Sequence, residues 1–171
     1  MPDIRERVEE DRGLLKRIQL HIPGFAGYRR REDQRQADSI LRIQLADRLK
    51  TVRGQMETSR AALADAYEIK VLEPLGRLVF ETEQLEGMIR HAEQGYSGFS
   101  WAIQVKEPEL DALYEFDLAL LDGLKTLEGK VLEIAPGESA APAVKECTAL
   151  LEQFRRTFKS RWARITGTEV A

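Results

Sequence analysis

The chain of 171 residues carries 26 lysines and arginines against 29 aspartates and glutamates, a formal net charge of -3 at pH 7. This length fits one folded domain, and 43% apolar residues are enough to form a core. No run approaches the roughly 20 apolar residues of a membrane-spanning helix, and the start lacks the order of a signal peptide. We therefore expect a cytoplasmic protein, and the single cysteine, Cys147, which cannot form an internal disulfide, suits a reducing compartment.

Apolar residues recur every three or four positions along most of the chain, which is typical of amphipathic helices with coiled-coil-like seams. Glycine and proline cluster at four places and separate five such segments. We predict helices over residues 3–20, 29–67, 71–94, 107–134 and 140–166.

Long amphipathic helices with short connections favour antiparallel packing. We therefore predict an all-α fold, an elongated antiparallel up-and-down bundle of about five helices, as a single domain over residues 1–171. Proline is tolerated only near the start of a helix, so Pro74 predicts a tight reversal near residues 68–71. One continuous helix kinked at Pro74 is the alternative.

Motifs that carry chemistry are missing from the sequence. Neither His21 nor His91 follows a glutamate by three positions, as a di-iron helical bundle requires, and two histidines and Cys147 lie too far apart for a zinc site. Phosphate-binding loops, dinucleotide fingerprints and nucleophile elbows are also missing. We predict no catalytic residue, no metal and no cofactor.

One polar residue interrupts an apolar stripe. Asp117 lies between Leu113 and Leu120, where the spacing of the fourth helix requires an apolar side chain. A buried carboxylate needs a partner, and a hairpin of the last two helices places Asp117 within reach of Arg155 or Arg161. We predict Asp117 and Arg155 as buried polar residues, with Arg161 as the other candidate. Exposure of Asp117, or a ligand pocket around it that serves a sensor or an enzyme, is the alternative.

Two predicted loops, residues 24–28 and 95–99, repeat the pattern glycine, aromatic, small residue, glycine, aromatic. Glycine permits close backbone approach, and the rings supply area for packing or docking. The rings therefore either plug one end of the bundle or bind a partner there.

The stretch from Phe154 to Ile165 contains five positive charges and no negative one, whereas residues 107–134 contain eight acids and two lysines. The simplest interpretation is internal charge complementarity between the last two helices. Alternatively, the basic helix binds anionic lipid or nucleic acid. Phe154 and Phe158 lie on the predicted core stripe, which makes a membrane or nucleic-acid surface the weaker hypothesis.

Antiparallel packing brings the loops and the basic stretch to one end of the bundle, and the opposite end, near Ile69 and Gly137, carries no comparable group. Aromatic rings rimmed by arginine resemble interface hot spots in composition. We predict a helical interaction or scaffold protein that binds an unknown protein partner, or another copy of itself, through this end. Its predicted partner-binding residues are Phe25, Tyr28, Arg29, Arg30, Arg31, Tyr96, Phe99, Trp101, Arg161 and Trp162.

The run Ile22-Pro23-Gly24-Phe25-Ala26-Gly27-Tyr28-Arg29-Arg30-Arg31-Glu32 resembles the opening motif of a family of uncharacterised prokaryotic helical proteins. In that family the motif reads roughly Pro-Gly-Tyr-x-Gly-Tyr followed by arginine and glutamate, and this chain has Phe25 at the first tyrosine. Residues 95–99 and 113–117 are similar to later segments of the same group. The resemblance covers about a third of the chain; it implies an all-helical fold and no particular activity.

Overall fold

Five helices form where the apolar spacing predicts them. The computed structural model describes residues 4–28, 31–92 and 107–166, and within these ranges it contains helices and turns but no strand. The prediction of an all-α fold is therefore confirmed. The helices are α1 (Ile4–His21), α2 (Arg31–Asp65), α3 (Ile69–His91), α4 (Glu107–Val131) and α5 (Ala140–Thr166).

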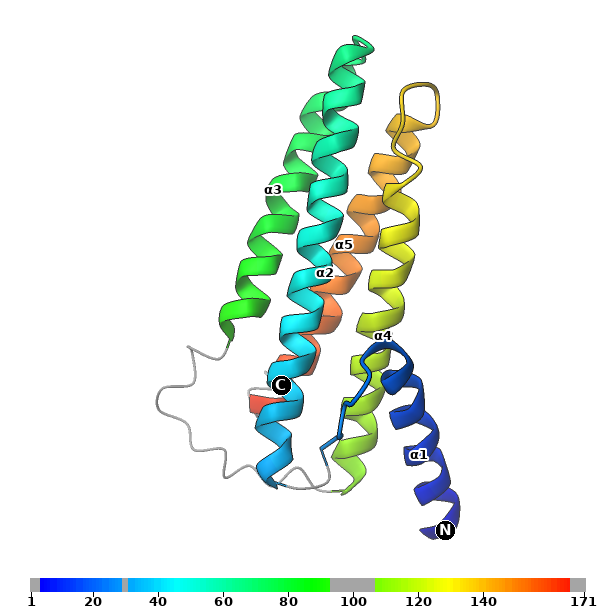
Figure 1. Ribbon diagram of the computed structural model, residues 1–171, viewed down its shortest axis with the longest axis vertical. Coiled ribbons are helices and arrows are strands. Elements are labelled where there is room, and N and C mark those ends of the chain that lie inside the picture. The colour runs from blue at the N-terminus through cyan, green and yellow to red at the C-terminus, as the bar shows by residue number, and fades with distance from the viewer. Residues whose placement is uncertain (1–3, 29–30, 93–106, 167–171) are drawn as a thin grey trace.

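Four long helices, α2 to α5, run side by side, and α1 packs against α4 (Figure 1). The contacts join α2 to α3, α4 to α5, α2 to α4 and α3 to α5. The turn between α2 and α3 lies at the same end as the loop between α4 and α5, and the starts of α2 and α4 lie at the opposite end with the end of α5 (Figure 1). The first of these ends is called the tip below, and the second is called the base.

Apolar side chains on the inner faces of the helices form one continuous core. Leu45 and Leu49 of α2, Leu120 and Leu124 of α4 and Leu151 of α5 are all fully buried. Burying one such side chain contributes about 1.5–3 kcal/mol. The stripes recognised in the sequence are therefore the surfaces that hold the bundle together.

The chain reverses direction between α2 and α3 at Ala66–Glu68, two to three residues before the predicted place. The N–H of Tyr67 donates to the carbonyl of Ala64 at 3.0 Å, and the N–H of Glu68 donates to that of Leu63 at 2.9 Å. These two bonds close the end of α2 in a Schellman turn. The alternative of one continuous helix kinked at Pro74 is therefore wrong, and Pro74 lies inside α3, five residues after its start.

No helix in the described ranges is long and apolar enough to cross a bilayer.

Candidate functional site

The base of the bundle contains a buried group of charged side chains centred on Arg161 of α5. The guanidinium of Arg161 is fully buried. It donates from Nε to Oδ1 of Asp117 at 2.5 Å and from Nη1 to Oδ1 of Asp38 at 2.8 Å. Its Nη2 donates to the hydroxyl of Tyr28 at 2.9 Å. A single side chain thus joins α2, α4, α5 and the loop after α1.

Asp38 also accepts a hydrogen bond from Nε of Arg42, one turn further along α2, at 2.8 Å. Asp38, Arg42, Asp117 and Arg161 are each at most 3% exposed, and they carry two negative and two positive charges. Buried charges are tolerated when they are paired and hydrogen-bonded. We call Tyr28, Asp38, Arg42, Asp117 and Arg161 the Arg161 network, and its formal charge balances to zero.

Tyr28 anchors the loop between α1 and α2 in this network. Its hydroxyl donates to Oδ2 of Asp117 at 2.5 Å, and its backbone N–H donates to the hydroxyl of Tyr114 at 2.9 Å. Its ring centroid lies 5.5 Å from that of Phe25 and 5.4 Å from that of Tyr114. Phe25 and Tyr28 are 0% and 2% exposed, so both rings fill the base of the core.

Gly27 allows this anchor to form. Its φ of +82° lies in the left-handed region, and a Cβ there would stand 2.5 Å from the hydroxyl oxygen of Tyr114. Any larger residue at this position would therefore push Tyr114 away from the N–H of Tyr28. Gly27 is therefore the glycine of this loop that close approach requires, whereas an added Cβ at Gly24, with φ of +83°, meets nothing within 4 Å.

Two members of the network, Tyr28 and Arg161, keep fixed charge states near neutral pH. Burial and the neighbouring Asp117 raise the pKa of the Tyr28 hydroxyl well above its ordinary value. Burial lowers the pKa of Arg161, but Asp117, Tyr28 and Asp38 outweigh it and the net pKa is raised. Tyr28 therefore stays neutral and Arg161 stays charged, which suits a structural network better than proton transfer.

The pKa values of the two carboxyl groups of the network, Asp38 and Asp117, shift in opposite directions. Burial raises the pKa of Asp38, but Arg161 and Arg42 outweigh burial, so the net shift is downward. Burial raises the pKa of Asp117 above its ordinary value, and Arg161 and Tyr28 offset this only in part. Asp38 accepts from two guanidinium groups, whereas Asp117 accepts from one guanidinium and one hydroxyl.

The prediction that Asp117 is buried is confirmed, and its partner is Arg161, the second of the two candidates. The prediction that Arg155 is buried is wrong: Arg155 is half-buried, and its Nη2 donates to the carbonyl of Glu81 at 3.5 Å. The reason is helical spacing. Phe154, Phe158 and Arg161 follow each other by four and three residues on the inner face of α5, whereas Arg155 lies one residue, about 100°, away from it.

The predicted partner-binding residues do not form one exposed group. Phe25, Tyr28 and Arg161 are buried, so the prediction that they present themselves to a partner is wrong for this structure. The rings of this loop plug the end of the bundle, which is the other interpretation of the sequence. Trp162 is half-buried and stacks on Phe158 with ring centroids 6.2 Å apart.

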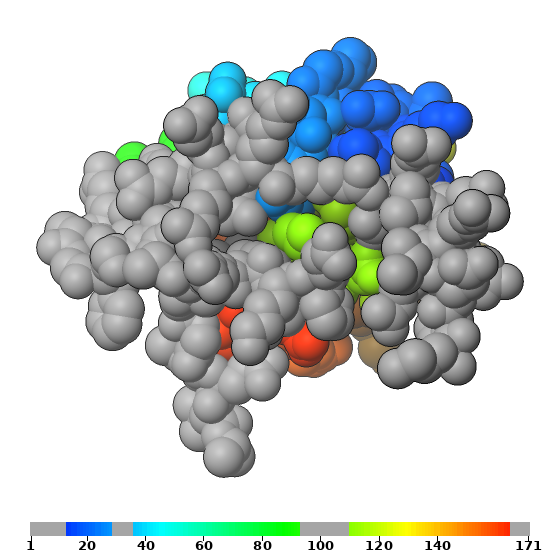
Figure 2. Space-filling view, turned by 90° about the horizontal axis from the view of Figure 1, so that it is seen from below, coloured from blue at the N-terminus to red at the C-terminus, as the bar shows by residue number. Residues whose placement is uncertain are grey.

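The remaining predicted residues lie where the structure gives no side-chain description. Arg31 is the first residue of α2, and Arg29, Arg30, Tyr96, Phe99 and Trp101 lie outside the described ranges. Figure 2 looks onto the base, where α1 and its following loop (blue), the first turns of α4 (yellow-green) and the end of α5 (red) are visible. Partner binding by these residues stays a prediction.

The basic stretch of α5 is divided between the interior and the surface. Arg161 pairs inward with Asp117 of α4, in agreement with the predicted internal complementarity. Lys159 and Arg156 are exposed, and the nearest carboxylate oxygen to Arg156 is that of Glu152, 3.9 Å away. Because Phe154 and Phe158 are buried in the core, they cannot form the apolar face of a membrane-binding helix.

Asp38 and Arg42 are members of the network that are not among the residues predicted from the sequence. Asp38 precedes Leu41 by three positions and Arg42 precedes Leu45 by three, so both lie on the inner face of α2. They interrupt that stripe in the way Asp117 interrupts the stripe of α4. The same signal, a charged residue at an inner position, identifies Asp38, Arg42, Asp117 and Arg161 when it is applied to every helix.

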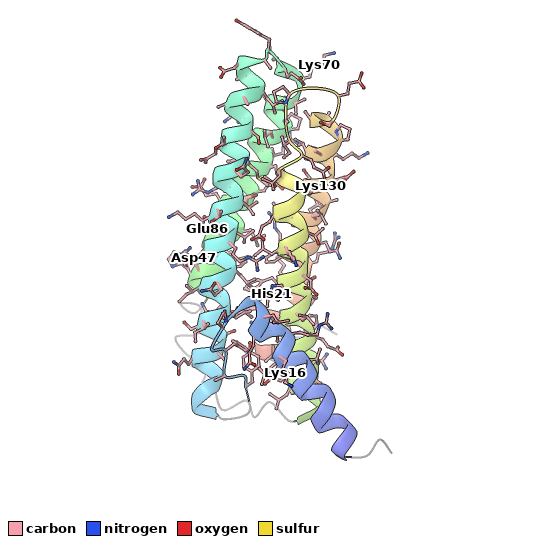
Figure 3. All side chains as sticks on the ribbon, turned by 45° about the vertical axis from the view of Figure 1, so that its right-hand side comes forward. Lys16, His21, Asp47, Lys70, Glu86 and Lys130 are labelled. Carbon is pink, nitrogen blue, oxygen red and sulfur yellow. The ribbon has the colours of Figure 1, made fainter. Side chains whose placement is uncertain are left out.

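Among the described residues, no group of three histidine, cysteine, aspartate or glutamate side chains is placed to hold a metal ion. On the side of the bundle, His21 at the end of α1 (Figure 3) approaches Asp122 of α4, with 3.4 Å between Nε2 and Oδ1. This contact fastens the end of α1 to α4.

No model of a known protein family, no curated protein and no solved structure matches this chain. The resemblance to the prokaryotic helical family therefore stays a prediction. A proposal about function has to be argued from the geometry of the chain itself.

Proposed function

We propose that this chain is a cytoplasmic helical interaction protein that binds a protein partner through the base of its bundle, where Arg29, Arg30 and Arg31 follow the Tyr28 anchor. The observation that carries this proposal is the fixation of Tyr28. Its backbone, hydroxyl and ring are all held, by Tyr114, Asp117 and Arg161. A fixed anchor directly before three arginines supports a preorganised binding surface.

The position of the arginines also supports an external role. Arg31 is the first residue of α2, at the end where the helix dipole is positive. A cation at this end costs about 0.3–1 kcal/mol, whereas Glu32 and Asp33 suit it. The helix dipole therefore gives Arg31 no favourable role at the start of α2, and we propose that an acidic partner surface supplies one for this run of arginines.

The chemistry of the buried polar groups favours interaction over catalysis. Asp117, Tyr28 and Arg161 are the side chains best suited to a reaction, and they bind one another at no more than 2% exposure. A ligand pocket around Asp117 requires that these bonds be broken. We therefore favour a binding protein over the sensor or enzyme that the sequence left open.

Affinity capture with chemical cross-linking from a native lysate tests this proposal. Wild type is compared with a variant in which Arg29, Arg30 and Arg31 are changed to Glu. The matched control changes Lys50, Arg77 and Lys125 to Glu, three exposed residues on the shafts of α2, α3 and α4, for the same change in net charge. Circular dichroism verifies that all three proteins keep the same helix content.

We expect a partner that wild type and the control retain and that the triple arginine variant loses at least tenfold. If the arginine variant retains every partner that wild type captures, the base is a structural end and the proposal is wrong. Equal losses in both variants would also contradict it, because they would indicate a general effect of charge.

A further inference from the structure

The side of the bundle has a small apolar hollow where α3 ends. Its volume is about 250 Å³, and it lies between the end of α3 and the last turns of α5. Pockets that hold drug-sized ligands have volumes of roughly 300–1,000 Å³, so this hollow is better matched to a side chain. Its lining consists of Met88, Ala92, Phe158, Lys159 and Trp162. We call it the α3 hollow.

Four of the five lining residues are apolar, and two of them are aromatic. The rings of Phe158 and Trp162 stack with their centroids 6.2 Å apart. Met88 is 38% exposed and Trp162 is half-buried, so apolar surface remains open at the hollow. Aromatic rings and the methionine sulfur both pack favourably against further rings. The α3 hollow therefore suits an aromatic side chain.

The hollow lies where α3 stops short of the base. Nη2 of Arg90, in the last turn of α3, donates to Oδ1 of Asp47 of α2 at 2.8 Å, which places these two residues at the same level. Because α2 begins at Arg31, 16 residues before Asp47, its start lies about 24 Å nearer the base. Figure 1 shows the same difference, since α3 ends well above the starts of α2 and α4. Below the hollow, α3 no longer packs against α2 or α5.

The chain that leaves α3 at Ala92 has to pass this place. The 14 residues 93–106 connect it to Glu107, at the start of α4. Among the described helices, α3 contacts α2 and α5 but not α4, so α4 lies diagonally across the bundle. With neighbouring helices about 8–10 Å apart, descending about 24 Å and crossing this diagonal requires about 28 Å, whereas 14 extended residues reach about 46 Å. The connection therefore starts at the hollow and has length to spare for packing there.

The composition of this connection calls for apolar contacts. Residues 94–105 contain no charged side chain, although 32% of the chain is charged. They include three aromatic residues, Tyr96, Phe99 and Trp101. Contiguous apolar residues are rarely left in water on a monomeric protein. We therefore expect some of these rings to pack against the bundle, and the α3 hollow is the apolar surface at which the connection begins.

A second argument comes from the repeated pattern of glycine, aromatic, small residue, glycine, aromatic. In the copy at residues 24–28 both rings, those of Phe25 and Tyr28, are buried in the base. The two glycines of that copy have φ of +83° and +82°, a conformation that glycine adopts readily. Residues 95–99 have the same residue types at the same five places, starting three residues after Ala92. The pattern therefore predicts that this second copy also buries its rings against the bundle.

We propose that the aromatic residues of the second copy, Tyr96 and Phe99, bind in the α3 hollow against Met88 and Trp162. The competing occupants are another protein and a second copy of the chain. A tethered segment has an effective concentration on the order of millimolar, which favours it over free competitors. This contact joins the end of α3 to the end of α5, and it removes both rings from the residues available to a partner. It does not involve the arginines of the base, so either proposal can hold without the other.

Cross-linking between two introduced cysteines tests this contact in the full-length protein. Ser97→Cys, between the two rings, is combined with Lys159→Cys at the hollow, and a short bis-maleimide links thiols that lie close together. The matched control combines Ser97→Cys with Lys125→Cys, an exposed lysine of α4 about 27 Å from the start of that helix. The native Cys147 is buried and is present in both pairs. We expect at least about fivefold more intramolecular product at position 159 than at position 125, measured by gel electrophoresis and mass spectrometry.

The fluorescence of Trp162 tests whether the rings themselves fill the hollow. Trp101→Phe leaves Trp162 as the single tryptophan. In this background, Tyr96→Ser with Phe99→Ser should increase the quenching of Trp162 by acrylamide about twofold or more, because the two rings no longer contact and shield it.

The matched control for the quenching experiment is Tyr67→Ser with Phe80→Ser in the same background. It removes the same two residue types from positions that are 85% and 56% exposed, and it should leave the quenching unchanged. Circular dichroism verifies that every variant keeps its helix content. If loss of the two rings prevents folding, the cross-linking pair, which keeps both rings, decides the question.

Equal cross-linking at positions 159 and 125, or quenching that does not change when the two rings of the second copy are removed, would overturn the proposal. Cross-linked dimers whose yield rises with protein concentration would assign the hollow to a second copy of the chain and would overturn it as well. The variant with Arg29, Arg30 and Arg31 changed to Glu should cross-link to the same extent as its parent. Its capture of a partner can therefore fail while the cross-link persists, so the two proposals fail separately.

Discussion

Arg161 of α5 donates from Nε to Oδ1 of Asp117 of α4 at 2.5 Å, and both side chains are completely buried. The same guanidinium bonds to Asp38 of α2 and to Tyr28, so four segments of the chain meet at one cation. Replacing one member of such a pair leaves an uncompensated buried charge, which costs far more than the pair contributes. Single substitutions in the Arg161 network should therefore lower the free energy of unfolding by a measurable amount.

We predict that Arg161→Met lowers the free energy of unfolding by about 3–5 kcal/mol, because Asp117 then keeps only the Tyr28 hydroxyl and Asp38 keeps only Arg42 among the bonds described above. Urea denaturation followed by circular dichroism measures the change. Arg156→Met, on the exposed side of the same helix, is the control and should stay within about 0.5 kcal/mol of wild type. Equal effects of the two substitutions would show that Arg161 acts only as helix surface.

A double-mutant cycle measures the interaction energy between Asp117 and Arg161. Asp117→Leu combined with Arg161→Met removes both charges, so we expect the double variant to lose clearly less stability than the sum of the single variants, by about 1–3 kcal/mol. The same urea titrations provide the four free energies. Strict additivity would mean that Asp117 and Arg161 are not coupled in solution.

Tyr28→Phe removes the hydroxyl that bridges Asp117 and Arg161 and preserves the ring. We predict a loss of about 1–3 kcal/mol, because a carboxylate oxygen and a guanidinium N–H both lose a buried partner. Tyr67→Phe is the matched control at 85% exposure and should have no measurable effect on unfolding. If Tyr28→Phe left the free energy of unfolding unchanged, the Tyr28 hydroxyl would contribute nothing to the network.

Gly27→Ala tests the close approach of the loop to α4. A methyl group there meets the Tyr114 hydroxyl at 2.5 Å in a backbone with φ of +82°, so we predict a loss of at least about 1–2 kcal/mol. Gly54→Ala should instead stabilise the protein, because Gly54 lies inside α2 with nothing within 4 Å of the added atom. It should gain about 0.5–1 kcal/mol, and thermal unfolding of both variants verifies the contrast.

The lowered pKa of Asp38 predicts how stability changes in acid. A carboxyl whose folded pKa lies below its ordinary 3.8 adds stability above that value and loses it as the pH falls through the folded pKa. The stability difference between wild type and Asp38→Asn should therefore shrink as the pH is lowered from about 5 to about 2. Urea midpoints measured over this range test the prediction, and a constant difference would contradict it.

Cys147 should be inert in the folded protein. Its side chain is buried, and burial raises the pKa of the thiol to about 11. At pH 8 roughly one thiol in a thousand is then ionised, and it is shielded from reagents as well. We predict slow labelling by iodoacetamide in buffer and rapid labelling in denaturing urea, measured by mass spectrometry. Rapid labelling in buffer would show that α5 opens easily.

The sequence by itself determined the helices and their inner faces. Apolar residues at spacings of three and four can be buried only by amphipathic helices, so the five segments, the reversal before Pro74 and the burial of Asp117 followed from local pattern. The interruption of a stripe by a charged residue also indicated that a buried partner had to exist, because an unpaired buried carboxylate is too costly.

Only the tertiary structure decided which cation that partner is. Arg155 and Arg161 are both within reach of Asp117 along the chain, but the face of α5 that turns inward depends on its packing against α3 and α4. That packing placed Arg161 inside, brought Asp38 and Tyr28 to it from distant segments, and buried Phe25 instead of presenting it. The exposure of Tyr67 at the tip has the same cause, since a local pattern cannot specify which side chains find a neighbour.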